Sequence, residues 1–465
     1  MTEPTNFISI KHLYSRAAFG ISYPALEKID NWNISRAVNQ LFKTSEKFEE
    51  LLIPEDVIQV KRTTPIAGLT EEEKKELIRN SRQNVRLLNT SWLQKMATSD
   101  AQLREKLTLF WHGHFACRSQ NASFLQDLNN IHRRHALGNF RTMLLEVSQS
   151  PAMLQFLNNQ QNRKGKPNEN FARELMELFT LGQGNFSEMD VKEAARAFTG
   201  WGYNQNGDFQ FRKALHDEGD KTFFGNKGNL NGTDIIDRIL ERPEAAQFIA
   251  GKLYSFLVSD SVDELRVKEL GTYFFDANYD ISALVKKILT AEWFYETSLI
   301  GSKIKSPIEL IVGINRQFSV RYKNPDVLLK FQNALAQVLF YPPNVAGWSG
   351  GRNWIDSSSL MVRLKIPSLI LNAGIIEFDG KTDIEDEAII AMNRIKRPVL
   401  DRMVSSETDW EQFLSGLPPK MQFKELADFL LQTAIHPQKV KSLEKSSGIL
   451  SATIELLSMP EYQMC

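Results

Sequence analysis

Cysteine and long apolar runs are scarce in this sequence of 465 residues. Only Cys117 and Cys465 occur, too few for a disulfide framework, so we expect a reducing compartment. The segment Met1–His12 has no basic region followed by an apolar run, and no window holds the roughly 18 apolar residues of a membrane-spanning helix. The sequence therefore predicts no signal peptide and no transmembrane segment, and we expect a cytoplasmic protein.

A net charge is also missing, because the 56 lysines and arginines balance the 56 aspartates and glutamates. This balance excludes a molecule-wide field that would hold a nucleic acid, so no nucleic-acid partner is expected. Any charged ligand must instead meet a local pocket. Hydrophobic residues make up 42% and charged residues 24%, proportions that are typical of an ordered globular protein.

Several well-known chemical motifs are absent as well. The sequence contains no P-loop, no GxGxxG and no paired CxxC. It also lacks HExxH and the ExxH of helical di-iron sites. These absences remove the usual support for P-loop NTPases, Rossmann enzymes and zinc ribbons.

Helical periodicity is present from end to end and predicts a mainly α protein, a large multi-helix globular architecture with one small β-hairpin insertion. The hairpin is predicted at 208–224, where Phe209 and Phe211 alternate with polar residues and Thr222–Phe224 return as the partner strand. We expect a main helical domain at 1–375 and a C-terminal helical segment at 376–465 packed on it, with a single domain as the alternative. Helices are predicted at 9–18, 22–31, 70–99, 101–111, 138–149, 168–181, 187–199, 233–258, 281–296, 306–319, 324–339, 357–372, 423–434 and 448–458.

The helix predicted at 168–181 is apolar over a wide arc and has one narrow polar stripe. Arg173, Glu174 and Glu177 lie on that stripe, and Gly182 is placed to end the helix. Two carboxylates one turn apart beside an arginine are a candidate catalytic edge. The alternative is that Arg173 forms an ion pair with Glu177 and that Glu174 forms one with another arginine.

The run Phe110–Phe115 is the most metal-like feature. His112 and His114 flank a glycine, and both imidazoles could ligate a divalent transition metal if the backbone is extended there. In a continuous helix they would lie about 200° apart and could not share a metal. His216 and Asp217 would complete the set, unless Asp217 caps a turn and His216 stacks on an aromatic ring.

The loop Tyr341–Ile355 has two prolines, several glycines and two tryptophans. Trp348 and Trp354 with Arg352 are candidates for an aromatic platform that binds a sugar or another polar ligand. The alternative is that both rings pin the loop to the helices.

Taken together, these segments resemble the bacterial domain-of-unknown-function family DUF1800, and the matching residues span almost the whole chain. They are His12-Leu13, Arg16-Ala17, Phe19-Gly20, Phe110–His112, His114-Phe115, Ala136–Phe140, Pro151–Met153, Asn158–Gln160, Asn162-Arg163, Asn168–Gly182, Glu193–Arg196, Thr199–Trp201, His216-Asp217, Lys221-Thr222, Gly225, Pro342–Val345 and Gly347-Trp348. The run Asn168–Gly182 is the most specific. The resemblance implies a bacterial protein with no established activity, often encoded beside a second family that looks related to sulfatases and alkaline phosphatases. The resemblance also implies that many relatives are exported, which differs from the cytoplasmic expectation.

Three functions follow from these residues. The first is an enzyme or enzyme partner that carries out metal-assisted hydrolysis, with Glu174 or Glu177 as general base. Its expected site residues are Arg173 and the ligands His112, His114, His216 and Asp217. The second is a non-catalytic module that binds an anionic or sugar ligand through Arg118, Arg163, Arg173, Arg196 and the tryptophan loop. The third is a structural or interaction protein in which these polar residues satisfy one another.

Overall fold

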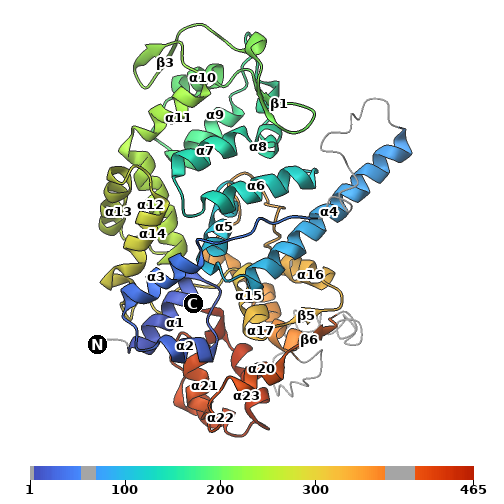
Figure 1. The fold of residues 1–465 in the computed structure, drawn as a ribbon, viewed down its shortest axis with the longest axis vertical. Helices are drawn as coiled ribbons and strands as arrows, with labels where there is room; N and C mark the ends of the chain where they lie inside the picture. The colour runs from blue at the N-terminus through green and yellow to red at the C-terminus, as the bar shows by residue number, and fades with distance from the viewer. Residues whose placement is uncertain (1–4, 54–69, 372–403) are drawn as a thin grey trace.

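The computed structural model describes residues 5–53, 70–371 and 404–465. The fold is mainly α with a few short antiparallel strand pairs, as the sequence predicts. The molecule is elongated: α10 (Glu188–Ala197) and β3 (Lys221–Phe223) lie at one end and α21 (Phe423–Leu430) lies at the other (Figure 1). Within the described residues, no helix combines the length and the apolar character needed to cross a membrane.

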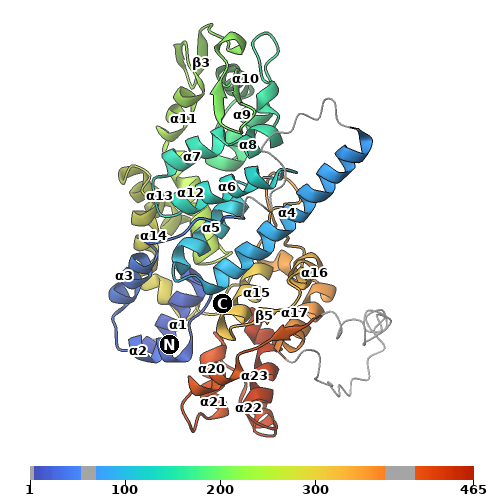
Figure 2. The ribbon, with the colours of Figure 1, turned by 45° about the vertical axis from the view of Figure 1, so that its right-hand side comes forward.

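The N-terminal helices precede one very long helix. The preceding helices are α1 (Asn6–Ala17), α2 (Tyr23–Ile29) and α3 (Ile34–Thr44), and the long helix is α4 (Glu71–Thr98). Thr70 and Glu73 form the capping box that starts α4, as the acidic first turn predicts. Only the second half of α4 is buried, and its first half projects from the body of the molecule (Figure 2).

The central core is built from the helices that follow α4. They are α5 (Gln102–His114), α6 (Ala122–His135), α7 (Phe140–Gln149) and α8 (Pro151–Phe156). Arg133 of α6 pairs with Glu105 of α5 at 2.7 Å, and both side chains are completely buried. Trp92 donates a hydrogen bond to the same carboxylate at 2.9 Å. A buried charge pair that is fully hydrogen-bonded ties three helices together at this point.

The segment predicted as one helix at 168–181 is helical from Asn170 to Thr180 and changes type on the way. It begins as α9 (Asn170–Glu174) and continues as the π-helical turn η2 (Leu175–Thr180), after the short 3₁₀ helix η1 (Asn159–Gln161). The amide of Leu181 donates to the carbonyl of Met176 at 2.8 Å. This hydrogen bond spans five residues instead of the four of an α-helix, which defines a π-turn. Gly182 ends the segment with φ of +76°, as predicted. The next helix, α10, starts with the capping box of Ser187 and Asp190.

The strands form two hairpins after α10, and the predicted pairing was wrong. Strand β2 (Phe209–Phe211) pairs with β1 (Trp201–Tyr203), whereas β3 pairs with β4 (Asn226–Gly228). Phe224 and Gly225 both have positive φ, which makes the two-residue turn between β3 and β4. The chain between β2 and β3, with the 3₁₀ helix η3 (Lys213–Leu215), crosses from one hairpin to the other.

Helices cover the rest of the main body. They are α11 (Gly232–Leu240), α12 (Pro243–Leu257), α13 (Glu264–Asp276), α14 (Ile281–Thr290), η4 (Glu292–Tyr295), α15 (Pro307–Gln317), α16 (Asp326–Ala334), η5 (Gly351–Trp354) and α17 (Ser357–Leu371). The helix predicted at 233–258 is two helices, because Arg242 is extended and Pro243 starts a new helix.

The C-terminal segment packs back on the N-terminal half. It contains β6 (Ser406–Glu407), α20 (Trp410–Ser415), α21, α22 (Pro437–Leu443), α23 (Ile449–Leu457) and η6 (Pro460–Gln463). Strand β6 pairs with β5 (Arg321–Tyr322) of the main body. The amide of Cys465 donates to the carbonyl of Lys303 at 2.7 Å, and the C-terminus lies beside α1 (Figure 1). The predicted boundary at 375/376 lies outside the described residues.

Candidate functional site

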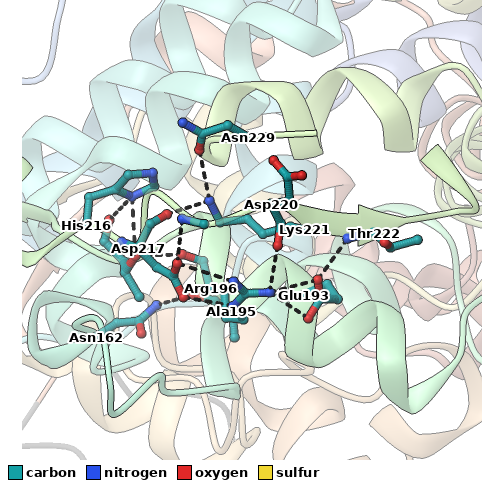
Figure 3. A network of polar contacts seen from close by, with 12 residues as sticks. Asn162, Glu193, Ala195, Arg196, His216, Asp217, Asp220, Lys221, Thr222 and Asn229 are labelled. Atoms are coloured by element: carbon teal, nitrogen blue, oxygen red, sulfur yellow. Dashed lines mark hydrogen bonds and ion pairs between the residues drawn. The ribbon is translucent and has the colours of Figure 1, made fainter. Parts of the chain in front are cut away.

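Arg196 on α10 is the centre of a polar network at the hairpin end of the molecule (Figure 3). Its Nε and Nη2 donate to the two carboxylate oxygens of Asp217 at 2.8 and 3.2 Å. Its Nη1 donates to both oxygens of Glu193 at 3.0 Å. The hydrogen bonds from Arg196 hold the pKa of Asp217 below its usual range. Asp217, predicted as a metal ligand, is therefore an ionised partner of an arginine.

His216 is buried beside this network. Its Nδ1 lies 2.8 Å from the carbonyl oxygen of Thr199 and 3.2 Å from the hydroxyl of the same residue. Since a carbonyl oxygen only accepts, Nδ1 is the donor in this hydrogen bond. The ring also meets Phe211 edge-on at 5.1 Å, and Asp217 accepts from the amide of Gly219 at 2.9 Å. This is the turn and ring-packing alternative that the sequence left open.

Carboxylates of α10 hold the β3–β4 hairpin in place. Glu193 accepts from the amide of Thr222 at 2.8 Å, and Asp190 accepts from the amide of Phe224 at 3.1 Å. Lys221 is fully buried and donates to the carbonyl of Asp217 and to Asn229 (Figure 3). Burial lowers the pKa of Lys221. The network thus joins α10, the crossing segment and the hairpin.

His112 and His114 do not share a face. Helix α5 continues through His114, so the extended backbone that a shared metal requires is not present. Nε2 of His112 accepts from the amide of Phe340 at 3.1 Å, whereas Nε2 of His114 lies 3.0 Å from the carbonyl of Phe179. Burial lowers the pKa of each histidine to about 3, so both are neutral.

The four expected metal ligands therefore lie apart, since His216 and Asp217 belong to the Arg196 network. Among residues 5–53, 70–371 and 404–465, no group of three or more histidine, cysteine, aspartate or glutamate side chains is arranged to hold a metal ion.

The polar stripe on α9 and η2 has different partners from those predicted. Arg173 pairs with Glu188 at 2.7 Å and with Glu169 at 3.2 Å, and not with Glu177. Glu177 instead accepts from Gln183 at 2.6 Å. Partial burial raises the pKa of Glu174, and the neighbouring charge of Glu177 raises it further.

The loop after α16 is pinned to the core. The Trp348 ring packs against His112 with centroids 5.4 Å apart, and Trp354 is buried. Gly347 has φ of +80°, and a Cβ there would lie 2.5 Å from the carbonyl oxygen of Gly113. Arg352 is exposed on the same loop. The two tryptophans thus make separate packing contacts, which is the pinning alternative.

A broad surface hollow of about 800 Å³ lies between the turn after η1, the start of α9 and the segment after β2. We call it the basic hollow, and its lining residues are Gln160, Gln161, Arg163, Lys166, Pro167, Asn168, Glu169, Asn170, Arg173, Arg212 and Leu215. It brings together two of the predicted ligand-binding arginines, Arg163 and Arg173. Arg196 is committed to its network, and Arg118 is exposed on the loop after α5, so neither lines the hollow.

Asn162 fixes the turn that carries Arg163 into the hollow. This buried side chain donates to the carbonyl of Ala195 at 2.8 Å and accepts from the amide of Asn168 at 2.9 Å. The turn closes with a hydrogen bond of 3.0 Å from the Lys166 amide to the Arg163 carbonyl. Arg163 and Lys166 are therefore exposed side chains on an ordered backbone.

Arg212 was missed by the sequence reasoning. Its guanidinium lies against the backbone of Gly202, where a Cβ would be 1.9 Å from Nη2. The signal in the sequence was the glycine after Trp201, because a strand glycine often marks the close approach of another group. Arg163, Lys166 and Arg212 have no ion pair with any described residue, whereas Arg173 has two.

The fold and the basic hollow define a mainly helical protein with a polar surface hollow at its hairpin end. A family model described as "Protein of unknown function (DUF1800)" matches residues 12–464, nearly the whole chain. The chain belongs to this family, which confirms the resemblance seen in the sequence. No curated protein and no solved structure matches the chain.

Proposed function

We propose that this protein is a binding module for an anionic group, such as the phosphate or sulfate of a modified sugar, and that the ligand lies in the basic hollow. The observation that carries the proposal is the charge of the lining. Four cationic side chains face one carboxylate, Glu169, and that carboxylate is already paired with Arg173. Arg163, Lys166 and Arg212 therefore keep their charge free for a ligand.

The types of side chain fit such a ligand. Guanidinium groups bind phosphate and sulfate in a bidentate manner, and Arg163 and Arg212 supply two of them. The amides of Gln160, Asn168 and Asn170 add donors and acceptors that suit sugar hydroxyls. Because the hollow is open to solvent, we expect binding that weakens as salt increases.

The same observations favour binding over the metal-assisted hydrolase that the sequence also suggested. His112, His114 and His216 lie in different surroundings, and Asp217 is held by Arg196. Glu174, one of the two expected general bases, has a raised pKa and is partly exposed.

Binding of glucose 6-phosphate tests the proposal. At low salt, this compound should raise the melting temperature of the parent protein and give a saturable calorimetric titration. The variants Arg163→Ala and Arg212→Ala should each weaken the affinity roughly tenfold, by the loss of about 1–2 kcal/mol from one charge-assisted hydrogen-bond pair.

The matched control is Arg238→Ala, which removes an exposed arginine paired with Glu241 on α11. It should bind like the parent. If Arg163→Ala and Arg212→Ala also bind like the parent, or if neither glucose 6-phosphate nor a sulfated monosaccharide binds at all, the ligand does not lie in the basic hollow and the proposal fails.

A further inference from the structure

A second cavity, far from the basic hollow, lies where the two ends of the chain meet. Its volume is about 70 Å³ and its walls come from α1, α5, α15, α21 and η6. The lining includes the apolar residues Phe19, Ile21, Phe429 and Tyr462, and also three lysines, Lys11, Lys106 and Lys305.

The three lysines line the cavity, but only one of them forms an ion pair with a described carboxylate. Lys11 and Lys106 are 5% and 1% exposed. Lys106 forms an ion pair with Glu309. Lys11 donates only to the carbonyls of Asp428 and Leu431. Lys305 donates to the carbonyl of Tyr462 at 2.7 Å. Two of the three ammonium groups thus have no carboxylate partner among the described residues.

Two further buried cations lie near the cavity, although neither belongs to its lining. Arg16 donates to the carbonyls of Val258 and Leu299 at 3.0 and 2.8 Å. Arg363 is completely buried and donates to the carbonyl of Lys305 at 2.9 Å, while its Nε and Nη2 have no hydrogen-bond partner in the described chain. The ε-nitrogen of Arg16 is likewise unpaired. Four buried cationic side chains and the partly buried Lys305 therefore gather in one region of the core.

The opposing negative charges are fewer. Glu309 is the acidic side chain in the cavity wall, and Lys106 holds its pKa at about 2 against the effect of burial. Cys465 contributes a favourable charge to Arg16 and Lys305, Asp428 contributes one to Lys11, and Asp260, which is paired with Lys303, contributes one to Arg16. Burial still outweighs these effects, because it lowers the pKa of Lys11 and of Lys305 to about 8.

Charges removed from water need a counter-charge, since an unpaired buried ammonium group loses several kcal/mol of hydration. We propose that this cavity binds a small oxyanion, such as sulfate, phosphate or a short carboxylate, with Lys11 and Lys305 as its counter-charges. A cavity of about 70 Å³ has room for such an ion and excludes a phosphorylated sugar.

Calorimetric titration with sodium sulfate tests this site, because sulfate keeps the same charge from pH 7 to pH 9.5. Binding should be at least tenfold weaker at pH 9.5, where amines with a pKa of about 8 are mostly neutral. The arginines of the basic hollow remain charged at that pH, so sulfate bound there would lose little affinity. Sodium acetate, titrated in parallel, distinguishes a carboxylate ligand from an inorganic one.

Variants assign the signal to the cavity. Lys305→Met and Lys11→Met keep the length of the side chain, and each should weaken sulfate binding at pH 7 at least tenfold. Lys441→Met, on an exposed face of α22, is the matched control and should change nothing. The double variant Arg163→Ala/Arg212→Ala should bind sulfate in the cavity like the parent, so the failure of one proposed site is distinguishable from the failure of the other.

Two results would overturn the inference. One is a sulfate affinity that is the same at pH 7 and pH 9.5 in the parent protein, a measurement that needs no variant to fold. The other is sulfate binding that survives Lys305→Met and Lys11→Met but is lost in the double arginine variant, which would place all bound sulfate in the basic hollow.

Discussion

At the scale of single residues, the histidines of α5 and α6 show how burial decides chemistry. His112 and His132 are buried with 4% and 0% exposure, and burial lowers the pKa of both. Burial also lowers the pKa of His114, whose ring contacts Phe115 and Phe179. A histidine that stays neutral suits a packed core, and here it packs against aromatic rings.

Because the pKa values of these histidines are lowered in the folded protein, we expect a loss of stability in mild acid. Their folded pKa lies below the unfolded value of about 6.5, so the unfolded chain binds more protons as pH falls from 6.5 toward 3. The stability is fully present above pH 6.5 and declines below it, by up to about 1.4 kcal/mol per pH unit for each histidine. Urea unfolding between pH 8 and pH 4.5 measures this slope.

His114→Gln is the informative variant, because glutamine can still donate to the Phe179 carbonyl. The slope of its unfolding free energy against pH should be smaller than that of the parent by the equivalent of about one proton. The difference in unfolding free energy between the two proteins at pH 8 serves as the baseline. Equal slopes in both proteins would show that His114 does not titrate on unfolding.

The sequence indicated which arginines are candidates for binding an anion, but it did not show which of them form ion pairs within the protein. Arg163 and Arg173 were predicted to bind an anion, and both line the basic hollow. Arg196 was predicted with them and is instead held by Asp217 and Glu193. The sequence did not show these partners, because Asp217, which binds Arg196, and Glu188, which binds Arg173, come from other parts of the chain.

At the scale of elements, the loop Tyr341–Ile355 depends on one glycine. Gly347 has positive φ and lies against the backbone of α5. A side chain at that position would meet the Gly113 carbonyl, which cannot move aside like a flexible side chain. The packing of Trp348 on His112 follows from this close approach.

Gly347→Ala should therefore destabilise the protein by about 2–4 kcal/mol, from the left-handed backbone and the steric clash together. Gly350→Ala is the matched control in the same loop, since its φ is −96° and nothing lies within 4 Å of the added Cβ. It should change the unfolding free energy by less than about 0.5 kcal/mol. Urea midpoints at constant m-value make the comparison, and equal midpoints for the two variants would contradict the role of Gly347.

Helices with a clear apolar stripe were predicted well, as α4 and α10 show. Helix α6 was missed although Phe124, Leu125, Leu128 and Ile131 recur at helical spacing. The fold also buries polar residues of this helix, among them Asn129, Asn130, His132 and Arg133. The predicted hairpin pairing was also wrong. Alternation marks a strand but does not identify its partner, which the turns on either side select.

At the scale of the whole molecule, the C-terminal segment is joined to the main body at several points. Strand β6 pairs with β5, and the Lys305 amide donates to the carbonyl of Gln463 at 2.8 Å. The rings of Tyr23 and Phe429 meet at 5.2 Å. From contacts so distant in sequence, we expect the main domain and the C-terminal segment at 376–465 that packs on it to unfold as a single cooperative unit.

Native-state hydrogen exchange tests this expectation. Peptides from α15 and from α23 should open with the same free energy and the same dependence on denaturant, because they share one packed core. If α20 to α23 instead exchange at lower denaturant while α15 stays protected, the C-terminal segment is a separate folding unit.

The sequence by itself determined the helical class, the caps of the main helices, the family and the absence of a net charge, because these depend on local pattern and composition. Only the tertiary structure decided which charges are free. It placed Arg212 over Gly202, committed Arg196 to two carboxylates and enclosed Lys11 and Lys305 between the chain ends. Those outcomes depend on distances between residues far apart in the sequence, and such distances are set by packing.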